Sequence, residues 1–149
     1  MTMKILILLF ALGAGMLLPL QAGLNTRMGK ALGDPVYAAL ISFAVGTALL
    51  FVYILTARTN LGNIRQATDL HWVFWCAGGL GAVFVAATII LTPTLGAAMT
   101  FSLVVAGQLI MAVFMDHFGL FGIQVHPASG MRIIGIILIT AGVVLIRKF

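Results

Sequence analysis

Charged residues are scarce in this sequence. Only 7% of its 149 residues are charged and 62% are hydrophobic, whereas about a quarter of the residues in an ordinary soluble domain are charged. Such a chain has too little polar surface to cover a water-soluble globule. The composition therefore predicts an integral membrane protein.

Acidic residues and cysteine are almost absent. The chain has no glutamate, and its three acids, Asp34, Asp69 and Asp116, fall at expected helix ends or in loops. A buried carboxylate is the usual proton relay in membrane transporters, so the sequence offers no obvious one. The single cysteine, Cys76, excludes a disulfide within the chain and any zinc-finger-like pattern.

Nothing in the sequence predicts an enzyme. The three histidines, His71, His117 and His126, show no metal-ligand spacing with Cys76 or with an acid. The glycine-rich stretch 78–81 is typical of helix packing rather than of a nucleotide-binding loop. We therefore expect no catalytic residues, no metal and no cofactor. The net charge of +5 is assigned to helix ends that contact lipid headgroups rather than to nucleic-acid binding.

Long apolar runs are what the sequence has in abundance. A bilayer core about 30 Å thick requires about 20 apolar residues per helical crossing. The runs cover residues 5–24, 35–57, 72–92, 95–115 and 131–147. In the last and shortest of these, Arg132 and Arg147 can extend their charged groups toward the two interfaces. We expect an all-α protein in which residues 1–149 form one five-helix transmembrane domain.

The first run also resembles a secretory signal peptide, because Lys4 precedes an apolar stretch that ends near Ala22. Retention of the run is favoured, since it is long for a signal core and four further spans follow. The residue two positions before Ala22 is also the bulky Leu20.

The structure of three connections between the spans can be predicted from their residues. Gly33-Asp34-Pro35 ends one helix and begins the next, with Asp34 as N-cap and Pro35 at the first helical position. Thr92-Pro93-Thr94 predicts a tight hairpin between the third and fourth spans. Residues 116–130 are expected to form an interfacial loop, in which Asp116 and His117 either titrate as a pair or cap a helix.

Basic residues divide evenly between the two sides of the membrane. An excess of Lys and Arg on one side normally sets the orientation of a membrane protein. With five spans, one side receives Lys4, Arg58, Arg65 and Arg132, and the other receives Arg27, Lys30, Arg147 and Lys148. The tie favours a chain that inserts both ways and pairs with an inverted copy of itself. The alternative is that the first helix or the membrane potential decides the orientation.

Several motifs carry a family resemblance over nearly the whole chain. They are PLQAGLN (19–25), GDPVYAALISFAVG (33–46), WCAGGLGAVFV (75–85), LGAAMTFSLVVAGQL (95–109), DHFGLFG (116–122) and GIILITAGVVLI (135–146). With them the chain resembles the short five-helix YdcZ-type branch of the drug/metabolite transporter superfamily. Larger relatives have ten helices in two inverted halves. The resemblance implies that this chain is one half of such a fold.

The resemblance also implies partners. The second half would come from an antiparallel homodimer, or from a heterodimer with a related short chain. Gly135 and Gly142 lie two helical turns apart on one face, and they resemble the terminal dimerisation helix of the small multidrug resistance transporters. Paired glycines can equally pack against helices of the same chain. The expected function is export or exchange of a small molecule or metabolite by alternating access across the inner membrane of a bacterium, where the chain also contacts lipid.

Polar side chains inside the spans predict a substrate path. Proline lacks a backbone donor, so Pro19 should kink the first helix and free the carbonyl group of Gly15. We expect a polar lining and, as walls, two aromatic rings. The lining residues are Gln21, Asn25, Thr100 and Gln108, and the walls are Phe101 and Phe84. An inverted second copy would bring its Gln108 to within about 5 Å of the depth of Gln21, at 1.5 Å of rise per residue.

Other interpretations remain open for the same residues. Gln21 and Gln108 can serve as interhelical hydrogen-bond contacts, each contributing roughly 0.6 to 2 kcal/mol. The protein would then be a membrane scaffold or a regulatory subunit. A passive dual-topology channel for a small ion is a third possibility. The lack of a membrane-embedded glutamate departs from the four-helix multidrug exchangers and weighs against proton-coupled export of cationic drugs.

Overall fold

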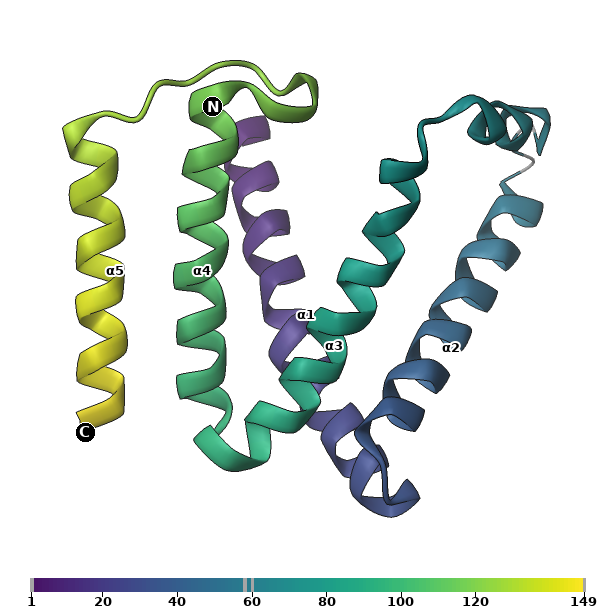
Figure 1. Ribbon diagram of the computed structural model, residues 1–149, viewed down its shortest axis with the longest axis horizontal. Coiled ribbons are helices and arrows are strands. Elements are labelled where there is room, and N and C mark those ends of the chain that lie inside the picture. Colours follow the sequence, from purple (N-terminus) through teal and green to yellow (C-terminus); the bar gives the residue numbers. More distant parts are fainter. Residues whose placement is uncertain (1, 58, 60, 149) are drawn as a thin grey trace. The chain divides into compact units, whose positions relative to one another are not determined.

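A computed structural model describes residues 2–57, 59 and 61–148 of the chain (Figure 1). Arg58, counted above among the loop cations, lies outside the described residues. The α-helices are α1 (Thr2–Leu32), α2 (Pro35–Thr56), α3 (Cys76–Leu95), α4 (Ala97–Phe118) and α5 (Gly130–Lys148), and three short 3₁₀ helices are η1 (Leu61–Asp69), η2 (Trp72–Trp75) and η3 (Leu120–Gly122). The expected all-α fold is confirmed, and within the described residues five helices are long and apolar enough to cross a membrane.

The first connection forms as predicted. Gly33 adopts a φ of +76°, which glycine tolerates best. Asp34 then caps α2, and its Oδ1 atom accepts a hydrogen bond of 2.6 Å from the backbone N–H of Val36. Pro35 occupies the first turn of α2, where its missing donor costs nothing.

The second connection was predicted at the wrong place. Helix α3 continues through Pro93 to Leu95, and the chain turns at Gly96, which has a φ of +81°. A proline near the end of a helix removes only its bond to the carbonyl four residues back, here Ile89, so the last turn can persist. Gly96 can adopt the left-handed conformation that ends α3, and Thr92-Pro93-Thr94 cannot supply it as readily.

The third connection is shorter than predicted. Helix α4 extends to Phe118, so Asp116 and His117 belong to its last turn, and Gly119 ends the helix with a φ of +61°. The loop is tied back by Arg132, whose Nη2 atom lies 2.9 Å from Oδ2 of Asp116 and whose Nη1 donates to the carbonyl oxygen of His126 at 2.9 Å. His117 Nδ1 accepts a 3.1 Å bond from the N–H of Ala128. Asp116 and His117 thus fasten a turn.

The chain divides into two compact units, Met1–Thr94 and Leu95–Phe149. In the first unit the core lies near the α1–α2 hairpin. It consists of Ala38, Ala39, Val85 and Ile89, with Met28, Phe84 and Ala86 packed against it. Gly29 permits the close approach, because a Cβ atom there would lie 3.3 Å from Cα of Pro35 and 3.4 Å from Cγ2 of Ile89. In the second unit, α4 and α5 lie side by side (Figure 1).

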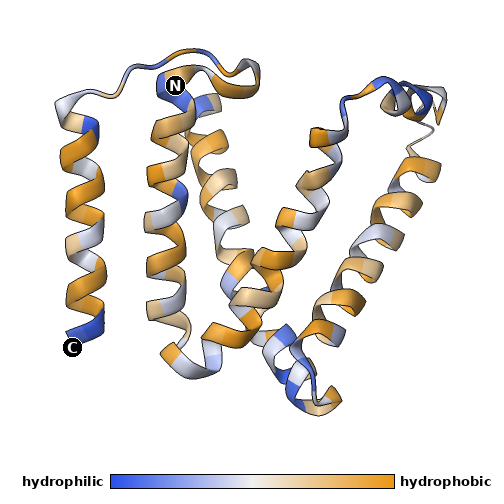
Figure 2. Cartoon of the chain, viewed as in Figure 1, coloured by the Kyte–Doolittle hydropathy of each residue, from blue (hydrophilic) through white to orange (hydrophobic). Residues whose placement is uncertain are grey.

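Hydrophobic residues make up most of each helix, and hydrophilic residues are concentrated at the helix ends and in the connections (Figure 2). Most large apolar side chains of the helices are exposed. Exposed apolar helix surface is stable in contact with lipid tails or with another apolar helix. The fold is therefore suited to a bilayer, and its outer faces are available to lipid or to a partner.

Candidate functional site

The strongest candidate site is a groove between α1 and α2. Gln21 of α1 donates a hydrogen bond from Nε2 to Oγ of Ser42 on α2 across 3.4 Å. Two cavities, of about 490 and 250 Å³, are both lined by this pair. A bond of 3.4 Å is at the long limit for hydrogen bonding, so the pair is weakly held and available to another partner.

Asn25, one turn from Gln21, has an amide nitrogen with no hydrogen-bond partner among the described residues. Its side chain is 4% exposed and lines the larger cavity. Among the described residues, no acceptor lies within hydrogen-bond distance of its Nδ2 atom. Leaving a buried donor without a partner costs about 1–3 kcal/mol. A buried donor in that state is suited to an acceptor atom that arrives with a ligand.

The rest of the larger cavity is apolar. Its remaining lining residues are Leu17, Leu18, Leu20, Leu24, Met28, Ile41 and Val45. A few amides and one hydroxyl in an otherwise apolar cavity are typical of small-molecule sites, in which polar groups fix the orientation of the ligand. The groove fits a molecule with an apolar body and at least one hydrogen-bond acceptor.

The length of α1 changes the expected depth of this groove. The sequence placed the end of the first span at residue 24, whereas α1 continues to Leu32. Gln21 therefore lies about 16 Å from the end of the helix instead of about 5 Å, at 1.5 Å of rise per residue. Gln108 lies near the middle of α4. Both glutamines are thus closer to the centre of their helices than to the ends, and transporter sites lie near the bilayer midplane.

The other predicted lining residues belong to the second unit. Thr100 is 1% exposed, and its hydroxyl group donates to the carbonyl oxygen of Gly96 at 2.8 Å. Phe101 and Gly142 line a cavity of about 340 Å³ between α4 and α5. Gln108 is exposed and lines a further cavity of about 260 Å³ with Asp116. The structure thus brings Gln21 and Asn25 together, and a path shared with Thr100, Phe101 and Gln108 stays a prediction.

The surroundings of four further predicted residues can be described. Phe84 is half-buried and packs against the core of the first unit. Helix α1 continues through Pro19, whose missing N–H leaves the carbonyl of Gly15 without that helical donor. A Cβ atom on Gly135 or Gly142 would meet nothing within 4 Å. There is therefore free space beside both glycines, and Gly142 lines the cavity between α4 and α5.

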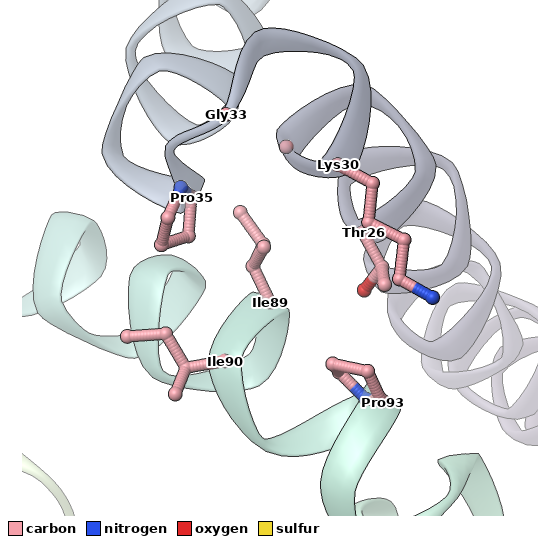
Figure 3. Close-up of a pocket in the computed structure, with 8 residues that line it drawn as sticks. Thr26, Lys30, Gly33, Pro35, Ile89, Ile90 and Pro93 are labelled. Carbon is pink, nitrogen blue, oxygen red and sulfur yellow. The ribbon is translucent and has the colours of Figure 1, made fainter.

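A third cavity in the first unit was not predicted from the sequence. It has a volume of about 440 Å³ and is shown in Figure 3. Its lining residues are Thr26, Gly29, Lys30, Gly33, Pro35, Ile89, Ile90 and Pro93. One signal was available, because Thr26 and Lys30 are four residues apart and share a helix face. The participation of α3 could not be read from the sequence.

Comparison with known proteins gives the same family as the motifs. A family model described as "Putative inner membrane exporter, YdcZ" matches residues 6–145. "Inner membrane protein YdcZ" of Escherichia coli (strain K12) is 31% identical over 144 residues, which cover 96% of this chain and 95% of that protein. No solved structure matches. A family of exporters points to transport rather than catalysis. The chain is a multi-pass inner-membrane protein that belongs to the YdcZ family of the drug/metabolite transporter superfamily.

Proposed function

We propose that the protein exports or exchanges a small amphipathic metabolite that carries a hydrogen-bond acceptor. We further propose that two copies work as an antiparallel pair by alternating access. The observation that carries this proposal is the unpaired, 96% buried amide of Asn25 beside the weak Gln21–Ser42 bond, in a groove that is otherwise apolar. A side-chain contact that served only to hold helices together would satisfy its own hydrogen bonds. Asn25 does not.

Three features support the paired arrangement. Five spans are an odd number, so that two inverted copies generate the inverted repeat on which many transporters are built. The basic residues divide equally between the two sides. A Cβ atom added at Gly135 or Gly142 would meet nothing within 4 Å, and small residues allow close helix approach in membranes. In the proposed pair Gln108, Thr100 and Phe101 complete the path that begins at Gln21 and Asn25.

The charge of the substrate follows from the placement of the charged residues. Asp34 caps α2, Asp116 pairs with Arg132, and Asp69 ends η1 outside the spans. No described spanning segment contributes a carboxylate to the groove between α1 and α2. A cation would enter the groove without a counter-ion, which is costly in hydrocarbon. An anion would likewise lack a partner, because no described Lys or Arg lines either cavity. The proposed substrate is therefore neutral at the end that enters the groove.

The test is transport in everted membrane vesicles from cells that express the chain. A panel of labelled neutral amphipathic metabolites is compared for the wild type, the double variant Gln21→Leu/Gln108→Leu, and the control Gln124→Leu. Gln124 is exposed in the loop before α5. Gln124→Leu therefore makes the same chemical change outside the groove. We expect saturable uptake in the wild type and the control, and a loss of at least tenfold in the double variant.

Two results would contradict the proposal. Flux that neither saturates nor shows competition between substrates would indicate a passive channel. Full transport in a well-folded double variant would show that the two glutamines are structural contacts, and that the path lies elsewhere.

A further inference from the structure

We propose that the cavity between the C-terminal part of α1 and the C-terminal part of α3 is a lipid site that holds the phosphate group of an anionic phospholipid. This cavity is separate in its lining residues from the Gln21–Asn25 groove. The inference does not rest on the proposed transport function. Its ligand atoms would be the hydroxyl of Thr26 and the ammonium group of Lys30 (Figure 3).

The Thr26 hydroxyl has no hydrogen-bond partner among the described residues. Threonines in membrane helices commonly donate to a carbonyl of their own helix, and Thr88, Thr92 and Thr94 of α3 do so. Thr26 departs from this pattern. Its Oγ1 atom is buried and has no hydrogen-bond partner among the described residues, and in Figure 3 it points into the cavity on the side of Pro93. A hydroxyl in that state can donate to an oxyanion.

Lys30 supplies the charge. Its side chain bends back along α1 toward the turn that carries Thr26 (Figure 3). Among the residues that the structure describes, no carboxylate lies within ion-pair distance of its Nζ atom. The nearest acid in sequence, Asp34, is engaged as the cap of α2 through the N–H of Val36. Lys30 and Thr26 therefore line one cavity, and no described acid neutralises the charge of Lys30.

The shape of the cavity favours a lipid over a small ion. Lys30 lies two residues from the end of α1, and Thr26 lies about 6 Å further in at 1.5 Å per residue. The polar groups are thus near the helix end, and the opposite wall is formed by Ile89, Ile90 and Pro93. A headgroup with attached acyl chains matches this division into a charged end and an apolar wall. Basic pockets between membrane helices are known to hold anionic headgroups.

The experiment is native mass spectrometry of the purified full chain with added lipid. Phosphatidylglycerol is compared with phosphatidylcholine for the wild type, Lys30→Gln, Lys30→Arg, Thr26→Val and the matched control Arg27→Gln. Arg27 is an exposed cation at the same end of α1 that does not line the cavity. A further series adds inorganic phosphate as competitor, which distinguishes a free anion from a lipid headgroup.

We expect preferential retention of phosphatidylglycerol by the wild type. Affinity should fall on the order of fivefold in Lys30→Gln, the equivalent of about 1 kcal/mol per basic residue near the surface, and by a smaller factor in Thr26→Val. Lys30→Arg and Arg27→Gln should stay within twofold of the wild type, because the first keeps the positive charge and the second lies outside the cavity. Competition by millimolar inorganic phosphate would contradict the lipid assignment. Equal losses in Lys30→Gln and Arg27→Gln, or equal retention of the two lipids, would overturn the site altogether.

Discussion

Replacing Asn25 with leucine should make the protein more stable and less active at the same time. The Asn25 side chain is 4% exposed, and its Nδ2 atom has no partner among the described residues. Leucine has a similar shape and no polar atoms. An unsatisfied buried polar group costs about 1–3 kcal/mol, and membrane reference states recover part of that cost. We therefore expect Asn25→Leu to raise the free energy of unfolding by about 1 kcal/mol.

The matched control is Thr88→Val. Thr88 lies in the same unit and is equally buried, at 4% exposure. Its hydroxyl group, however, donates to the carbonyl oxygen of Val85 at 2.8 Å, so its removal should change stability little and leave transport intact. Equilibrium unfolding in detergent micelles measures the first quantity, and vesicle transport measures the second. The predicted pattern is a more stable, transport-deficient Asn25→Leu beside a nearly neutral Thr88→Val.

A fall in stability of about 1 kcal/mol or more in Asn25→Leu would contradict this prediction, because the amide would then have a partner that holds the fold together. Normal transport by Asn25→Leu would also contradict it, since the unpaired donor would then have no role in recognising a substrate. A variant that gains stability and loses transport, with the control unaffected, leaves a ligand-binding amide as the explanation.

Two further predictions concern the second unit. Asp116→Asn should lower the free energy of unfolding by about 1 kcal/mol or less, because the Asp116–Arg132 pair is 27–36% exposed and solvent screens such pairs. Thermal unfolding measures this quantity. A loss above about 3 kcal/mol would mean that the pair is buried in the assembly. Gly135→Ala and Gly142→Ala should leave the stability of the monomer unchanged, since an added Cβ meets nothing within 4 Å, and should weaken dimer cross-linking between copies. Loss of monomer stability with unchanged cross-linking would instead assign this glycine face to packing within the chain.

Sequence reasoning worked best where one local rule decides the structure. The number of spans follows from hydrocarbon thickness, and the cap at Asp34 follows from the chemistry of Gly-Asp-Pro. The turn before α4 was misplaced because two rules compete there. A proline ends many helices, but Pro93 costs α3 only one bond, and the left-handed conformation at Gly96 decides where the helix stops.

The site was predictable only in part, because its residues come from different helices. Gln21 and Asn25 stand out as amides within an apolar run, and their common face follows from helical spacing. The bond to Ser42 depends on how α1 and α2 pack, which the spacing along one helix does not determine. Thr26 escaped notice because threonines usually bond to their own helix. Only the structure shows that this hydroxyl is without a partner.

The sidedness of the C-terminus tests the central claim, an inverted pair of copies, most directly. Cys76 is replaced by alanine, a single cysteine is added after Phe149, and labelling by an impermeant thiol reagent is measured in intact and in permeabilised cells. The account predicts partial labelling in intact cells that becomes complete on permeabilisation, because the two orientations are both populated. Labelling that is all or none in intact cells would contradict a pair of inverted identical chains.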